Sequence, residues 1–174
     1  NVELAITNLK AAKVLEPRKI YALPHKELAQ LIRSAGYFNI KARRLRAFVD
    51  KLVEQHGASL KRLMQGDTNT VRARLLDING IGPETADSML LYAGNHHSFV
   101  IDAYTKRIFS RHKWCGENAD YDDLKNLCFE SLNQKPGAAK LDYWRDYHAQ
   151  LVGVGSRYCK TRNPLCDECP LKPL

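Results

Sequence analysis

Three cysteines near the end of the chain have the spacing of a metal- or cluster-binding tail. Cys159, Cys166 and Cys169 fall within CKTRNPLCDEC, and the whole chain holds five cysteines. Thiolates bind zinc and iron–sulfur clusters, and nothing in the sequence marks a secreted, disulfide-bonded protein. Either kind of site needs four ligands. Cys115 and Cys128 are poor candidates for the fourth, because they lie in predicted helical stretches far from the tail. Three free structural cysteines are the alternative.

A glycine turn in the middle of the chain could bind an anion. In DINGIGPETAD one helix is predicted to end near Ile78 and the next to begin near Pro83. Gly80 and Gly82 flank Ile81, permit positive φ and let another backbone come close. The N–H groups of such a turn, together with the start of the next helix, suit a phosphate and read no base. The alternative is a tight helix–helix corner that needs glycine for packing alone.

Two carboxylates stand at predicted helix starts. Glu84 lies in the first turn of the helix that follows the glycine turn, where a negative charge is favoured by the helix dipole. Asp102 opens DAYTKRIFSRHKW and is well placed to cap that helix. The dipole also keeps such a carboxylate ionised, so capping and a chemical role are compatible.

The elements that must position these groups are predicted to be all-α. Apolar residues recur with the helical period, and neither a β-alternating stretch nor a repeat occurs. Gly36 and Gly57 are predicted to end two of the helices. The predicted helices cover 2–15, 26–36, 41–57, 58–66, 68–78, 84–94, 102–114, 121–134 and 138–159.

Length and composition narrow the class of protein. With 174 residues, 44% of them hydrophobic, the chain suits one globular domain or two small ones sharing an interface. Its apolar runs fall far below the ~20 residues of a membrane helix, and no signal peptide is visible. Together with the cysteine usage, this predicts a cytoplasmic protein. The chain opens inside a helical pattern without an initiator methionine, so a truncated N-terminus is expected.

The charge favours a polyanionic partner. The net charge is +8 and the isoelectric point is near 9.3. The basic residues cluster, and KARRLR at 41–46 lacks the alternating signs of a solvated helix face. A merely basic soluble protein is the alternative.

Taken together, these motifs resemble the helix–hairpin–helix DNA glycosylase superfamily. LLDINGIGPETADSMLLYAG followed by FVIDAYTKRI is similar to its hairpin and aspartate, and C-x6-C-x2-C is similar to the 4Fe–4S tail of the endonuclease III branch. GYFNIKA and HAQLVGVGSRYC extend the match over nearly the whole chain. The resemblance implies a helical bundle over 1–96 that carries the hairpin, a C-terminal helical domain over 97–174 that carries the cysteine loop, and a DNA-binding cleft between them. The first helices of the family pattern are missing.

The resemblance implies that Asp102 is the catalytic carboxylate. Cleavage of a base from deoxyribose builds positive charge on the sugar, which a fixed carboxylate stabilises while it orients or deprotonates water. Bifunctional relatives carry a lysine where this chain has Glu84, and a carboxylate cannot form a Schiff base. The departure predicts a monofunctional enzyme. For Glu84 itself, a charge favoured at a helix start is set against a place among the catalytic residues, where it would line the base pocket. Lys106, one helical turn after Asp102, is the alternative amine.

The resemblance also implies a surface for duplex DNA. The damaged base must be flipped out, and Tyr37, just after the glycine of GYFNIKA, is expected to fill its place in the stack. A core position is the alternative for Tyr37 and the expectation for Phe38. The other expected DNA contacts, chiefly to phosphates, are Gly80, Ile81, Gly82, Lys41, Arg43, Arg44, Lys106 and Arg107.

For the tail, the resemblance implies that Cys159, Cys166 and Cys169 are three ligands of a 4Fe–4S cluster. The family's fourth cysteine would fall at position 175, one past the end of this chain, so a longer native chain is expected to continue with cysteine. Zinc is the less expected metal. The cluster would have a structural and DNA-docking role, with Lys160 and Arg162 presented to phosphates.

The function predicted from these features is a monofunctional DNA N-glycosylase of base excision repair. Its expected substrate is an alkylated purine similar to 3-methyladenine, flipped from duplex DNA, and its expected state is a monomer without a membrane partner. GIGPETAD and FVIDAYTKR favour this choice, because they look most like the endonuclease III-type 3-methyladenine glycosylases. In a prokaryote such an enzyme is expected to be nucleoid-associated. The alternatives are an endonuclease III-like glycosylase for oxidised pyrimidines or mismatched bases, with or without AP-lyase activity, a non-catalytic DNA-binding module, and a zinc-stapled nucleic-acid protein.

Overall fold

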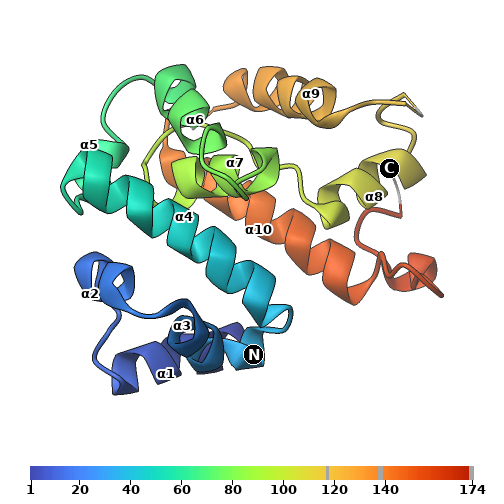
Figure 1. Cartoon of the computed structure of the whole chain (residues 1–174). Coiled ribbons are helices and arrows are strands. Elements are labelled where there is room, and N and C mark those ends of the chain that lie inside the picture. Colours follow the sequence, from blue (N-terminus) through green and yellow to red (C-terminus); the bar gives the residue numbers. More distant parts are fainter. Residues whose placement is uncertain (117, 137–138, 173–174) are drawn as a thin grey trace. The chain divides into compact units, whose positions relative to one another are not determined.

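The computed structural model describes residues 1–116, 118–136 and 139–172, and this part of the chain is helical with no strand (Figure 1). The predicted all-α class is confirmed. One predicted helix was expected to begin at residue 138, which lies outside the described residues. No helix within the described ranges combines the length and apolar character that crossing a membrane requires.

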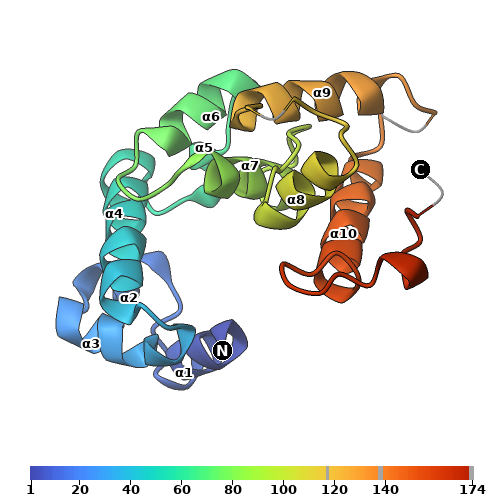
Figure 2. The ribbon, with the colours of Figure 1, turned by 90° about the vertical axis from the view of Figure 1, so that its right-hand side faces the viewer.

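Backbone contacts divide the chain into two compact units, Asn1–Gly82 and Pro83–Leu174. The first unit has a long helix, α4, against which the short helices α2 and α3 pack (Figure 2). Side chains of α1 to α4 form its apolar core, which includes the fully buried Leu28 and Ala42. The helices of the first unit are α1 (Val2–Ala11), α2 (Pro17–Ala22), α3 (His25–Leu31), α4 (Phe38–His56), α5 (Leu60–Leu63) and α6 (Thr68–Leu76), with a 3-10 turn at Arg33–Ala35.

The second unit is built around α10, which packs against α8 and α7. Trp144 of α10 is fully buried, and its ring lies edge-on to His97 and tilted against Phe99. The helices of the second unit are α7 (Pro83–Tyr92), α8 (Ala103–Arg111), α9 (Tyr121–Asn133) and α10 (Leu141–Arg157), with a 3-10 turn at Cys166–Glu168.

Along the chain the boundary between the units falls after residue 82, whereas the expected domain boundary fell after residue 96. The difference lies in α7, which the sequence analysis assigned to the first domain. Leu91 of α7 is fully buried in the same apolar cluster as Phe99 and Trp144, so its packing groups the helix with the second unit.

Local chemistry sets most helix ends. Gly57 ends α4 in the left-handed conformation at φ 61°, as predicted. Asp67 begins α6 by accepting a hydrogen bond from the Thr70 N–H at 3.0 Å. The sequence analysis missed α2, although Pro17 stands at its first position, where proline is favoured.

Candidate active site

The glycine turn lies between α6 and α7. The Ile81 N–H donates to the Ile78 carbonyl at 3.0 Å, and Gly80 has φ 89°. A Cβ on Gly80 would lie 2.3 Å from Cγ of Arg44. The missing Cβ of Gly80 therefore makes room for the Arg44 side chain of α4. Gly82 lacks a positive φ, and within the described residues no heavy atom lies within 4 Å of its Cβ position, which leaves open space beside the turn.

The start of α4 presents an aromatic ring and several cations. Tyr37 precedes the helix with φ 46° and ψ 35°, and 84% of its surface is exposed. A left-handed conformation is unfavourable for a tyrosine, yet no core contact explains it. Phe38 is half-buried against the first core, as expected. Lys41 donates to the Ala35 carbonyl, and Arg43 is exposed.

Asp102 combines a cap with a second, less occupied oxygen. It follows the buried segment Phe99–Ile101, and its Oδ1 accepts a hydrogen bond from the Thr105 N–H at 2.7 Å. The predicted capping of α8 is confirmed. Its Oδ2 lies 3.7 Å from Nε2 of His148, and its side chain is only 13% exposed. One oxygen thus holds the helix, and the other remains for an ionic or chemical role.

His148 of α10 is a site residue that the sequence analysis missed. Its ring is buried, and its Nδ1 lies 2.7 Å from the hydroxyl of Tyr92 at the end of α7. Burial lowers the pKa of His148, and the Asp102 carboxylate only partly opposes this shift. A signal was present in the sequence, because Trp144, His148 and Leu151 share one helical face and the histidine interrupts an apolar stripe.

Glu84 shares the electrostatic environment of Asp102. It lies in the first turn of α7 with much of its side chain exposed. Partial burial of the carboxyl group raises the pKa of Glu84, and the charge of Asp102 raises it further. A carboxyl group whose pKa is raised by burial and by a second carboxylate is typical of functional sites.

A buried polar network ties α7 to the segment that carries Asp102. Asp87 is completely buried and accepts hydrogen bonds from Ser98 Oγ at 2.6 Å, Tyr121 Oη at 2.9 Å and Lys125 Nζ at 2.6 Å. Tyr121 and Lys125 belong to α9, and Ser98 lies four residues before Asp102. The network therefore fixes α7, and with it Glu84, relative to the start of α8.

The basic residues of α8 differ in their surroundings. Lys106 is exposed. Arg107, expected to contact a phosphate, donates from Nε to the Cys159 carbonyl at 2.6 Å and from Nη2 to the Gly155 carbonyl at 3.1 Å. A Cβ on Gly155 would lie 2.5 Å from Cβ of Tyr104, so α8 and α10 touch closely here. Arg107 thus braces two helices, and we do not retain it as a phosphate contact.

Three sulfurs gather around one cavity in the tail. Cys159, Cys166 and Cys169 line a space of about 210 Å³ beside Arg111, whose guanidinium donates to Sγ of Cys159 at 3.3 Å. All three are free thiols. Among the residues that the structure describes, no three His, Cys, Asp or Glu side chains converge closely enough to hold a metal ion. Thiol sulfurs are a donor type that suits a bound metal or cluster, although the described side chains are not arranged as a metal site. Burial raises the pKa of the Cys128 thiol to about 12, which makes it a poor ligand.

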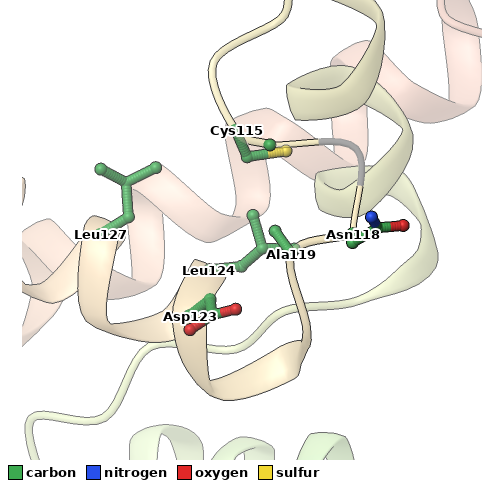
Figure 3. Close-up of a pocket in the computed structure, with 7 residues that line it drawn as sticks. Cys115, Asn118, Ala119, Asp123, Leu124 and Leu127 are labelled. Atoms are coloured by element: carbon green, nitrogen blue, oxygen red, sulfur yellow. The ribbon is translucent and has the colours of Figure 1, made fainter.

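A larger cavity of about 530 Å³ lies elsewhere in the second unit (Figure 3). Asp102, Glu84 and His148 do not line it, so its size does not mark the site. Its lining residues are Cys115, Gly116, Asn118, Ala119, Asp123, Leu124 and Leu127.

A glycine turn between helices, followed by a carboxylate at the next helix start, defines the helix–hairpin–helix class of DNA repair proteins. The family model described as "HhH-GPD superfamily base excision DNA repair protein" matches residues 1–134. The chain belongs to this superfamily of DNA glycosylases, in its endonuclease III branch.

Three comparisons illustrate the relationship. A Methanocaldococcus jannaschii protein named as a candidate DNA repair glycosylase is 43% identical over 99% of this chain and 76% of its own length. A non-covalent endonuclease III–DNA complex has the same fold, with a TM-score of 0.78 at 23% identity over 97% of this chain and 72% of that one. The H. pylori 3-methyladenine DNA glycosylase MagIII, bound to 1,N6-ethenoadenine, gives a TM-score of 0.72 at 29% identity over 88% of this chain and 76% of that one.

Proposed function

We propose that this protein is a monofunctional DNA N-glycosylase that removes an alkylated purine, similar to 3-methyladenine, from duplex DNA. The observation that carries the proposal is the pair of Asp102 and Glu84. Asp102 caps α8 with one carboxylate oxygen and keeps the other for chemistry. Glu84 places an acid where a lyase would need an amine. The likeness to a 3-methyladenine glycosylase supports the substrate class.

The proposed chemistry is a hydrolysis at C1′ of the deoxyribose. The C1′–N bond breaks and its electron pair leaves with the base, while Asp102 stabilises the positive charge that develops on the sugar. A water oxygen then bonds to C1′, and the carboxylate takes the proton that the water loses. An alkylated base that carries a positive charge leaves as a neutral molecule and needs no acid catalyst. Glu84, whose carboxyl group feels the charge of Asp102, favours such a cation.

The proposed DNA surface combines the hairpin with the basic helices. The N–H groups at Gly80, Ile81 and Gly82 and the start of α7 suit one phosphate. Tyr37, exposed and held in a left-handed conformation, fills the space of the flipped base. The remaining proposed phosphate contacts are Lys41, Arg43, Arg44 and Lys106.

For the tail we propose a 4Fe–4S cluster held by Cys159, Cys166 and Cys169 and completed by a fourth ligand. When bound, the cluster would cross-link the tail segment 159–169 and take no part in the hydrolysis. Arg111 already holds this segment through the Lys160 carbonyl at 2.7 Å. Zinc bound to the same thiolates is the second candidate. Visible absorbance of the purified protein distinguishes the two, because zinc gives none.

The test scores base release and strand cleavage separately on three duplexes, which contain a methylated purine, an oxidised pyrimidine or an abasic site. We expect free methylated base without nicks. Asp102→Asn should lower the rate at least about a hundredfold while the amide still caps α8. No loss in this variant would favour a different catalyst, and binding without release of any base would favour a non-catalytic DNA-binding module.

A designed substitution tests the absence of lyase chemistry. Glu84→Lys restores an amine at the position of the family lysine and should produce nicks and a borohydride-trapped adduct, whereas the matched Glu84→Gln variant should produce neither. Trapping of the unaltered protein would show that another amine, with Lys106 the first candidate, makes this an AP lyase similar to bifunctional endonuclease III.

A further inference from the structure

His148 carries a hydrogen-bonding group that the fold leaves without a partner. Its Nε2 is buried and makes no hydrogen bond. Leaving a buried donor unpaired costs about 1–3 kcal/mol. Thr105 Oγ1 and His97 Nε2 share this state, whereas other buried polar groups in the same unit avoid the cost. Asp87 and Ser98, for example, are bonded to each other at 2.6 Å. An unpaired group in a native fold calls for an explanation, and Asp102 supplies one.

The contacts of the ring assign its proton to Nε2. Burial raises the pKa of the Tyr92 hydroxyl, so this group stays protonated and can donate to Nδ1 of His148 at 2.7 Å. The lowered pKa of His148 keeps the imidazole neutral, and a neutral ring that accepts at Nδ1 carries its proton on Nε2. The opposite tautomer would turn a lone pair toward the Asp102 carboxylate, which is unfavourable.

We propose that His148 is a positioning residue, whose Nε2–H donates to Oδ2 of Asp102 when damaged DNA is bound. The present separation of 3.7 Å is too long for a hydrogen bond. Contacts of this kind are often long in the free enzyme and tighten in the complex with substrate. The inference rests on the proposed glycosylase function.

The contact would fix the carboxylate at two points. Oδ1 is already held by the Thr105 N–H, and a second donor at Oδ2 stops the group from turning about its Cβ–Cγ bond. A neutral donor does this without cancelling the negative charge that the sugar cation needs. Charge that is oriented before the reaction lowers the barrier more than charge that must reorient during it.

Three substitutions of one residue separate positioning from packing. His148→Leu should lower the single-turnover rate of base release about 10- to 100-fold, with the dissociation constant for DNA within about twofold of wild type. His148→Gln places an amide N–H near the position of Nε2 and should recover most of the rate. His148→Asn places its amide near Nδ1 and should not recover it. Equal rates for the Gln and Asn variants, or a full rate for the Leu variant, would overturn the proposal.

His97 provides the matched control. Its Nε2 is also buried without a partner, and its ring lies against Trp144 with centroids 5.4 Å apart. We expect His97→Leu, the match of His148→Leu, to change thermal stability and leave the single-turnover rate as it is. A similar loss of rate in both histidine variants would show that disturbed packing, and not the contact with Asp102, explains the effect.

A spectroscopic measurement keeps the inference independent of activity. Nitrogen-15 correlation spectra of the free protein should show His148 as the neutral tautomer protonated at Nε2, and Tyr92→Phe should weaken this preference. Protonation at Nδ1 would overturn the inference. If the unaltered protein releases no base from any duplex, the proposed function fails, and the tautomer still reports on the contact.

Discussion

The two units of this chain differ in charge and in what they bury. Residues 1–82 hold 15 Lys and Arg against 7 Asp and Glu, and residues 83–174 hold 12 of each class. The whole net charge of +8 therefore belongs to the first unit. An excess of this kind attracts a polyanion without reading its sequence.

The units also differ in their buried polar side chains. The buried polar side chains of the described residues, namely Asp87, Ser98, Thr105 and His148, all belong to the second unit. Buried polar groups are costly unless they are paired, and they are kept where geometry has to be fixed. The comparison therefore favours a first unit that attracts and holds DNA and a second unit that positions the reacting groups.

The largest expected loss of stability comes from a substitution in the buried polar network of the second unit. Asp87→Ala leaves Lys125, only 14% exposed, without its carboxylate and should lower the free energy of unfolding by about 3–5 kcal/mol in urea denaturation. The control in the first unit is Asp77→Ala, which removes the exposed partner of Lys51 and should leave stability close to wild type. Equal losses would mean that the units do not differ in this way.

A substitution at Tyr37 should slow the flipping of the base out of the duplex and leave the hydrolysis itself unchanged. Tyr37→Ala should slow base release from duplex DNA about tenfold, because no ring fills the vacated stack, and should leave release from a single strand unchanged. Tyr21, an exposed tyrosine of the same unit that donates to Glu54, provides the control substitution. A matching loss on single-stranded DNA would exclude the role of Tyr37 in the stack.

The salt dependence of DNA binding tests where the charge acts. Lys41→Ala and Arg43→Ala should each reduce the slope of log affinity against log salt concentration by about one. Lys135→Ala, which removes an exposed lysine from the neutral second unit, should leave the slope unchanged. If the Lys135 variant shows the larger change, the assignment of DNA attraction to the first unit is wrong.

The smallest effect is a pH dependence of stability. Burial lowers the pKa of His148 in the second unit and of His56 in the first from a reference value of 6.5. Below that value the unfolded chain binds more protons than the folded one, so stability should fall as the pH decreases. Denaturation at about pH 5.5 and about pH 7.5 should show a smaller difference for His148→Gln and for His56→Gln than for wild type. An unchanged difference would show that other groups cause the slope.

Local sequence signals predicted much of the fold and part of the site. The helical period, the glycine of α4 and the cap at Asp102 depend on neighbouring residues, and the structure confirms them. The partners of His148 and Asp87 lie up to 56 residues away, and no local pattern indicates them. Arg107 looked like a surface cation for the same reason, because the carbonyls that accept from it belong to Cys159 and Gly155, which lie 52 and 48 residues away.

Gly80 has a consequence for how the protein would search long DNA. Its missing Cβ lets the aliphatic part of Arg44 lie against the turn, which removes side-chain conformers before any partner arrives. Ordering such a side chain on binding otherwise costs about 0.5–1.5 kcal/mol. An Arg44 that meets a phosphate, as proposed, would do so at a low cost in side-chain entropy. Because a phosphate contact reads no base, it can form anywhere on undamaged duplex and lets a protein slide along it.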